Sequence, residues 1–187
     1  MIAEEEMVLT ITHNGYIKRT SLSTYRSQRR GGRGVQGASS REEDFVEHLF
    51  VANTHSYILF FTDKGKCYWV KVYDIPEGGR AAKGRAIVNL IGCEPDEKVS
   101  AFISVKEFNE DHYVVMATEK GMVKKTKLSA YSNPRKKGIY AVEIRDGDKL
   151  IEARVSTGDN DILLGTRNGK SIRFSEEQIR ASGRKTM

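Results

Sequence analysis

The 187-residue sequence has only two cysteines, three prolines and one tryptophan, and it contains no long apolar run. Cys67 and Cys93 form neither a C-x-x-C pair nor a group with histidine at metal-ligand spacing, so we expect them to be small apolar residues of the fold. No apolar stretch approaches the roughly 20 residues of a membrane helix, and the acidic residues 4–6 are unlike a secretory signal. The sequence therefore predicts a soluble cytoplasmic protein without a membrane partner.

Four segments share one pattern, in which an apolar run is followed by a tight turn ending in glycine and by a second run with basic residues interleaved. This pattern is typical of β-hairpins, whose turns need the positive φ that glycine adopts easily. The turn glycines are 50, 56 and 48 residues apart, which is the length of a four-stranded propeller blade. They are Gly15, Gly65, Gly121 and Gly169, and the predicted strands are 8–12 with 16–20, 58–62 with 66–72, 113–118 with 122–128, and 162–166 with 170–174.

Two further landmarks recur in the same order within the repeats. A second glycine opens a new strand at Gly34, Gly84 and Gly138, and acidic residues precede a fourth apolar run at 45–52, 99–105 and 150–155. We therefore predict an all-β, propeller-like fold of four-stranded blades, with repeats at about 6–55, 56–108, 112–158 and 159–187. The fourth repeat stops at Met187 before its last strands, so we expect three complete repeats, a partial fourth, and a chain that is part of a longer protein.

Catalytic groupings are missing from the sequence. The four histidines show no metal-ligand spacing, and there is no Ser/His/Asp arrangement. Tyr25 beside Arg26 resembles the nucleophile of a DNA-cleaving enzyme. The same repeat position is tyrosine at 73 and 131 but Ile179 in the fourth repeat, so we interpret this position as structural. We predict no catalytic residue, no metal site and no cofactor in this chain.

Positive charge is concentrated in particular segments. Lys and Arg outnumber Asp and Glu by 31 to 25, which gives a net charge of +6 and favours a polyanionic partner. Residues 7–41 and 122–142 contain many cations and no carboxylate. Because position in the repeat fixes position in the assembled fold, we expect the basic residues to line one outer edge. For any single charge run, a solvated surface without a ligand is the alternative interpretation.

The strongest local signal is an arginine–glycine segment at residues 28–34. Arginines fork two hydrogen bonds to phosphate oxygens, and glycines let backbone N–H groups approach a phosphate chain. The order of residues is not that of a nucleotide-binding P-loop, so ATP binding is not predicted here. The segment consists of Gln28, Arg29, Arg30, Gly31, Gly32, Arg33 and Gly34.

On these residues the chain resembles the C-terminal domain of the gyrase A subunits, which belong to the bacterial type II topoisomerases. The arginine–glycine segment is similar to the gyrase A box, usually Gln-Arg-Arg-Gly-Gly-Lys-Gly, except that Arg33 stands where the family has lysine. The resemblance extends over essentially the whole chain and implies a β-pinwheel whose blades exchange strands. The related topoisomerase IV domain typically lacks an intact box, so the segment favours gyrase.

The resemblance implies that the domain binds, bends and wraps double-stranded DNA without sequence preference, and so supports negative supercoiling. It assigns phosphate clamping to Arg29, Arg30 and Arg33. Further DNA contacts are predicted from repeat position alone at Arg80, Lys83, Arg85, Arg135, Lys136 and Lys137. Implied partners are the other gyrase A domains and the gyrase B subunit in an A2B2 enzyme, where ATP and Mg²⁺ would be needed only by the whole enzyme. The alternatives are a propeller-like scaffold for protein partners and the equivalent domain of topoisomerase IV.

Overall fold

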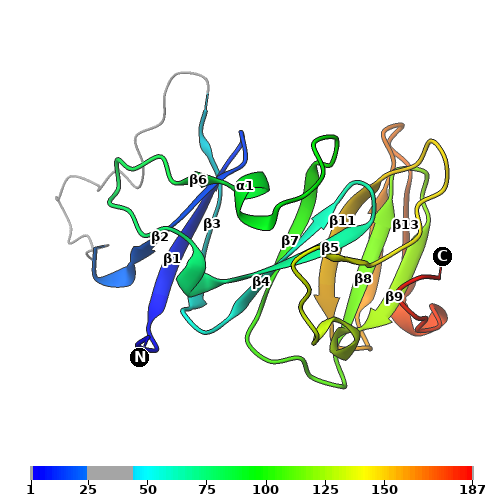
Figure 1. Cartoon of the computed structure of the whole chain (residues 1–187). Helices are drawn as coiled ribbons and strands as arrows, with labels where there is room; N and C mark the ends of the chain where they lie inside the picture. Colours follow the sequence, from blue (N-terminus) through cyan, green and yellow to red (C-terminus); the bar gives the residue numbers. More distant parts are fainter. Residues whose placement is uncertain (1, 25–43, 187) are drawn as a thin grey trace, which may run out of the picture. The chain divides into compact units, whose positions relative to one another are not determined.

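The computed structural model of the chain describes residues 2–24 and 44–186. The described residues form antiparallel β-sheets with short helical turns between the strands, as the all-β prediction requires (Figure 1). The strands are β1 (Glu6–Thr12), β2 (Tyr16–Ser21), β3 (Val46–Asn53), β4 (Tyr57–Thr62), β5 (Lys66–Lys71), β6 (Arg85–Ala86), β7 (Val99–Val105), β8 (Tyr113–Thr118), β9 (Val123–Lys127), β10 (Ile139–Tyr140), β11 (Leu150–Ser156), β12 (Asp161–Gly165) and β13 (Ser171–Ser175).

Each predicted hairpin is present, as the pairs β1–β2, β4–β5, β8–β9 and β12–β13. All four turn glycines have φ between 76° and 88°, so the left-handed conformation explains why glycine recurs there. A short 3₁₀ turn follows the second strand of every hairpin, namely η1 (Leu22–Thr24), η2 (Val72–Asp74), η3 (Leu128–Tyr131) and η4 (Glu176–Gln178). The helix α1 (Ile87–Ile91), which follows β6, was not predicted from the sequence.

The sheets contain strands from neighbouring repeats. In the order β3-β1-β2-β6, the strand β6 belongs to the second repeat but pairs with β2 of the first, where Ile17 faces Arg85. In the order β10-β5-β4-β7, the strand β10 of the third repeat pairs with β5 of the second, where Cys67 faces Ile139. The remaining sheets are β11-β8-β9 and β12-β13. This arrangement confirms the strand exchange that a β-pinwheel implies.

The chain forms two compact units. Unit 1 consists of Met1–Ile58, Trp69–Glu94 and Ser104–Lys106, and unit 2 of Leu59–Tyr68, Pro95–Ile103 and Glu107–Met187. The core of unit 1 contains side chains without exposed surface, such as Met7, Leu9 and Ile17, and the core of unit 2 contains Phe60, Phe61 and Leu150. Burial of each such side chain contributes about 1.5–3 kcal/mol to folding before the entropic cost is counted.

Tyr131 also lies in the core of unit 2. Its ring meets the ring of Phe61 edge to face at a centroid distance of 5.9 Å, and the side chain has no exposed surface. Because the side chain is fully buried, its hydroxyl is out of reach of a substrate, and burial also raises the pKa of the phenol far above its ordinary value. The structural interpretation of this repeat position is therefore supported at Tyr131, while Tyr25 lies outside the described residues. Cys67 is likewise a buried free thiol whose pKa is raised by burial.

A threonine three residues before each turn glycine stabilises the hairpin. Its hydroxyl accepts a hydrogen bond from the amide of the residue that follows the glycine, at 3.1–3.3 Å. In the third repeat, Thr118 accepts from Met122 N and also bonds the carboxylate of Asp148. The four threonines are Thr12, Thr62, Thr118 and Thr166.

Replacement of Thr118 by valine is expected to lower the free energy of unfolding by about 1 kcal/mol, because the hydrogen bond that the buried Thr118 hydroxyl accepts from Met122 N is lost. The measurement is urea unfolding followed by circular dichroism. Thr166→Val is the matched control, because Thr166 makes the same bond to Lys170 N in an exposed turn and its loss should change the value by less than about 0.5 kcal/mol. Equal effects of the two changes would contradict the assignment.

Candidate nucleic-acid interface

The arginine–glycine segment lies outside the described residues, so the clamping roles of Arg29, Arg30 and Arg33 stay predictions. The second repeat carries a loop at the same distance from its turn glycine, which we call the second-repeat loop (residues 78–84). Arg80 and Lys83 in this loop follow Gly65 by the same spacings at which Arg30 and Arg33 follow Gly15. The structure therefore describes a counterpart of the arginine–glycine segment in the second-repeat loop, which belongs to unit 1.

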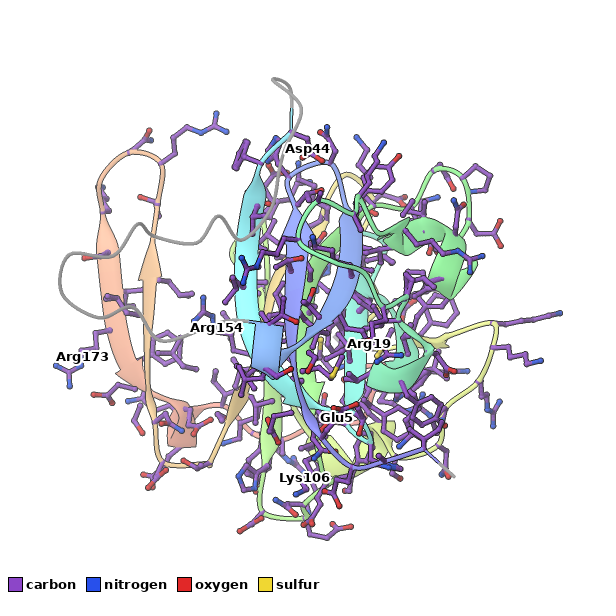
Figure 2. The ribbon with its side chains drawn as sticks, turned by 90° about the vertical axis from the view of Figure 1, so that its left-hand side faces the viewer. Glu5, Arg19, Asp44, Lys106, Arg154 and Arg173 are labelled. Carbon is purple, nitrogen blue, oxygen red and sulfur yellow. The ribbon has the colours of Figure 1, made fainter. Side chains whose placement is uncertain are left out.

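The second-repeat loop is bound along its backbone to β2 of the preceding repeat. Gly78 N donates to Arg19 O at 3.0 Å, and the Thr20 hydroxyl donates to Gly78 O at 2.9 Å. At the other end Gly84 has φ of 83°, and a side chain there would bring its Cβ within 2.3 Å of Ile17 O. Only glycine allows so close an approach of two backbones. Figure 2 shows Arg19 beside the chain that enters this loop, and its Nε donates to Ile75 O at 2.7 Å.

The predicted DNA contacts in unit 1 differ in exposure. Lys83 is exposed, with its ammonium 4.0 Å from the centre of the Tyr16 ring, and Arg85 is exposed on β6. Arg80 is half-buried, and its guanidinium donates to the carbonyl of Thr24, the last described residue before the arginine–glycine segment. Lys83 and Arg85 are therefore available to a phosphate, while Arg80 holds the chain that leads into the segment.

The third-repeat loop (residues 133–138) presents the cations predicted in unit 2. Arg135, Lys136 and Lys137 are all exposed, and within the described ranges none of them forms an ion pair. The loop is closed by a hydrogen bond of 2.9 Å from Gly138 N to Arg135 O. Gly138 packs on Tyr68 so closely that a Cβ would lie 2.7 Å from a ring carbon. Three adjacent cations on a loop anchored in this way can bind successive phosphates.

The expectation that the basic residues all line an outer edge is wrong for three lysines. The exposed fractions of Lys18, Lys124 and Lys125 are only 3%, 5% and 6%. Their ammonium groups bond backbone carbonyls contributed by the following repeat, so these charges are used inside the fold. Burial lowers the pKa of Lys18, and burial together with the charge of Arg184 lowers the pKa of Lys124 to about 8.

The carboxylates that precede the fourth strand of a repeat stabilise hairpin turns. Asp44 accepts hydrogen bonds from Asn14 N and Phe45 N, each at 3.0 Å, at the turn end of the β1–β2 hairpin (Figure 2). Asp148 accepts in the same way from Lys120 N and Lys149 N. Partial burial raises the pKa of each carboxyl, but the hydrogen bonds from hydroxyl and amide groups outweigh it and lower the pKa. The acids thus have structural partners away from the basic loops.

Two structural roles were missed at the sequence level, although signals for them exist. The threonines of the hairpin turns share the spacing Thr-x-x-Gly in all four repeats. The buried lysines share the sequence Lys-(Arg or Lys)-Thr at 18–20 and 124–126. Both patterns would have been found by aligning the repeats on their turn glycines.

The described residues contain no group of three or more His, Cys, Asp or Glu side chains that could hold a metal ion. In the same ranges, no helix is long and apolar enough to span a membrane.

Comparison with known proteins identifies one family across the chain. The family model described as "DNA gyrase C-terminal domain, beta-propeller" matches residues 6–53, 56–106, 112–157 and 160–187. The DNA gyrase A subunit of Clostridium acetobutylicum is 50% identical over 187 residues, which are 100% of this chain and 22% of that protein. The gyrase A subunit of Neisseria gonorrhoeae is 53% identical over 176 residues, which are 94% of this chain and 19% of that protein. The chain thus spans about one fifth of the length of these relatives.

Solved structures share the fold. The C-terminal domain of a DNA topoisomerase IV superposes with a TM-score of 0.83 at 28% identity, covering 100% of this chain and 56% of that one. A DNA gyrase A C-terminal domain superposes with a TM-score of 0.72 at 22% identity, covering 97% of this chain and 58% of that one. The second likeness establishes the β-pinwheel fold alone.

Proposed function

The chain belongs to the family of DNA gyrase C-terminal domains, and from this membership we propose that it binds, bends and wraps duplex DNA through its basic loops. The observation that carries the proposal is the pair of loops in the second and third repeats. Their cations are exposed at Lys83, Arg85, Arg135, Lys136 and Lys137, while their backbones are anchored by glycine to the neighbouring repeat. An anchored cationic loop loses little entropy when it meets a phosphate, which favours binding.

Electrostatic contact with the phosphates is sufficient to bend DNA. Bending 20–30 base pairs by 40–90° costs roughly 1–6 kcal/mol, and several phosphate contacts on successive repeats offset a cost of this size. The loops offer flexible cations instead of a helix that could enter the major groove, so the binding has little sequence preference.

In the whole enzyme the domain binds and wraps DNA and supplies no catalytic residue. The chain acts in the cytoplasm as part of the gyrase A subunit, together with the other A domains and the B subunit in an A2B2 complex. ATP and Mg²⁺ serve other parts of that complex. Wrapping would bring a second DNA segment across the segment at the cleavage gate with a defined handedness. In this way the domain would support negative supercoiling.

The alternatives are less well supported. A scaffold for protein partners gives no reason for exposed cations in two successive loops at matching repeat positions. The topoisomerase IV domain has a similar fold, but relatives at 45–53% identity are named as gyrase A subunits.

Three measurements test the proposed function. Duplex DNA should bind the chain with an affinity that falls steeply with salt, with a slope of about 0.9 per phosphate contact, and an affinity independent of salt would contradict it. Closed circular DNA relaxed by a type I topoisomerase in the presence of the chain should change its linking number if the duplex is wrapped. In the complete gyrase, Arg29→Ala with Arg30→Ala should reduce supercoiling, and an unchanged rate would contradict the clamping role.

A further inference from the structure

Two of the four repeats carry a buried lysine at the same position. Lys18 in β2 and Lys124 in β9 each follow the turn glycine of their hairpin by three residues. Each is followed by a second cation and a threonine, whereas Tyr68 and Ile172 occupy this position in the second and fourth repeats. A lysine with about 5% exposure or less needs a partner that compensates the loss of water.

In unit 1 that partner is the backbone of the second-repeat loop. The Lys18 ammonium donates to Gly79 O at 3.0 Å and to Arg80 O at 2.7 Å. These two carbonyls stand immediately before the part of the loop that bears Lys83. The same loop is already bound to β2, the strand of Lys18, through Gly78. The Lys18 ammonium adds hydrogen bonds to the next two residues of the loop, Gly79 and Arg80, on the side toward Lys83.

Unit 2 repeats this geometry independently. The Lys124 ammonium donates to Arg184 O and, at 2.9 Å, to Ala141 O. Arg184 follows its turn glycine, Gly169, by the same 15 residues that separate Arg80 from Gly65. The strand of Lys124 also bonds this part of the fourth repeat, because Ser182 N donates to Lys125 O at 2.8 Å. A lysine of one repeat thus holds the equivalent carbonyl of the next repeat in both units.

This contact matters for an anion. A carbonyl oxygen that faces a phosphate repels it, whereas a carbonyl bound to an ammonium group is turned inward and its charge is compensated. The ammonium also adds a positive charge directly beneath the loop. When the Lys124 ammonium loses a proton, the neutral amine still has two N–H donors. Both carbonyls can therefore stay hydrogen-bonded as the pH rises through the lowered pKa of Lys124.

We propose that Lys18 and Lys124 are positioning residues of the nucleic-acid interface. Lys18 holds the backbone of the second-repeat loop, and Lys124 holds the equivalent part of the fourth repeat at Arg184, so that the exposed Lys83 and Lys185 meet DNA. This assignment rests on the proposed function. It predicts that Lys18 contributes to DNA binding although its ammonium is buried, and that its contribution is made through Lys83 and its loop.

The test compares Lys18→Met with Lys71→Met in the 187-residue chain. Methionine matches the four-atom apolar stem of lysine and lacks the ammonium group. Lys71 is a matched control, because its ammonium also bonds a carbonyl, His55 O at 2.7 Å, but contacts neither basic loop. Lys18→Met is expected to weaken duplex binding about tenfold and to reduce the salt slope by about 1, whereas Lys71→Met should leave both within twofold. Equal losses in the two variants would overturn the proposal.

A double-mutant cycle identifies the route of the effect. Lys18→Met and Lys83→Ala should be non-additive in their effect on DNA affinity. Lys18→Met and Lys137→Ala should be additive, because Lys137 lies in the third-repeat loop, which Lys18 does not hold. A general loss of stability would give no such selectivity. Additivity in both cycles would overturn the proposal.

Hydrogen exchange separates this inference from the proposed function, because it needs no DNA. In Lys18→Met the amides of residues 79–83 should exchange faster while those of β1 stay protected, and unchanged exchange would overturn the proposal. If Lys18→Met does not fold, Lys124→Met provides the same test at residues 183–186. The two conclusions can fail separately. If Lys18→Met speeds exchange in the loop but the unaltered chain shows no salt-dependent DNA affinity, the contact between Lys18 and the loop is correct and the proposed DNA-binding function is wrong.

Discussion

Replacement of Arg135, Lys136 and Lys137 together by alanine is expected to weaken duplex DNA binding by more than tenfold at 0.1–0.15 M salt. The plot of log affinity against log salt should lose about 2–3 units of slope, because each neutralised phosphate contributes about 0.9. The three side chains are exposed and adjacent on a loop anchored by Gly138 against Tyr68. Since they support no core contact, the thermal midpoint should change little. The measurements are fluorescence anisotropy over a salt series and thermal unfolding.

A charge-matched control separates a local interface from bulk attraction. Lys149, Arg154 and Arg173 are three exposed cations of unit 2 outside the basic loops, and Arg173 points away from the β12–β13 hairpin in Figure 2. Each already faces a carboxylate, with distances of 3.2 Å to Glu119 for Lys149 and 3.4 Å to Glu152 for Arg154. Their triple alanine variant removes the same charge, yet it should lose less than threefold in affinity. Similar losses in the two triple variants would mean that net charge alone governs binding.

Replacement of Glu176 by alanine is expected to lower the free energy of unfolding by about 3–5 kcal/mol, the largest effect on stability that we predict. The Glu176 side chain is fully buried in η4, and its Oε2 lies 4.0 Å from the ammonium of Lys125. Its Oε1 accepts a hydrogen bond from Asn160 N at 2.8 Å. Removal of the carboxylate leaves Lys125 as a buried charge without its ionic partner. Urea unfolding at neutral pH measures the loss.

The adjacent Glu177 provides the control, because it is exposed and Glu177→Ala should change the stability by less than about 0.5 kcal/mol. A pH series adds a second criterion. Burial raises the pKa of Glu176, but the hydrogen bonds from Asn160 and the charge of Lys125 help to lower it below its ordinary value. A lowered carboxyl pKa stabilises the fold above the unfolded value near 4.5, and this contribution is lost as pH falls through the folded value. An alanine variant as stable as the unaltered chain would refute the paired-charge account.

The hairpins were predictable because their signal is local. A turn glycine must have positive φ, and the apolar runs on either side can only bury themselves as paired strands. The strand after Gly84 was also expected, since a second glycine recurs in the first three repeats. The close approach of Gly84 to Ile17 explains the glycine at that position. The helix α1 was not expected, because its five residues are too few for an amphipathic pattern to be recognised.

The candidate interface was only partly predictable. Exposed cations at Lys83 and Lys137 follow from loop position, but sequence alone does not reveal which lysines of a basic run turn inward. Lys18 and Lys83 have identical side chains, and only the carbonyls of a loop distant in sequence, at Gly79 and Arg80, determine that Lys18 is buried. Charge counts along the chain therefore overestimate the positive surface of strands β2 and β9, because they include Lys18, Lys124 and Lys125.

The exchange of strands between repeats means that a sequence repeat is not an autonomous folding module. The first sheet is completed by β6, so the shortest piece that could be excised with that sheet intact ends at Ala86 and not at Asn53. An insertion or deletion in the second-repeat loop would shift the register of a sheet that belongs to its neighbour. Loss of the whole second repeat would therefore damage two sheets, its own and the first sheet that β6 completes, and a change in the number of repeats would have to preserve the exchanged strands on both sides.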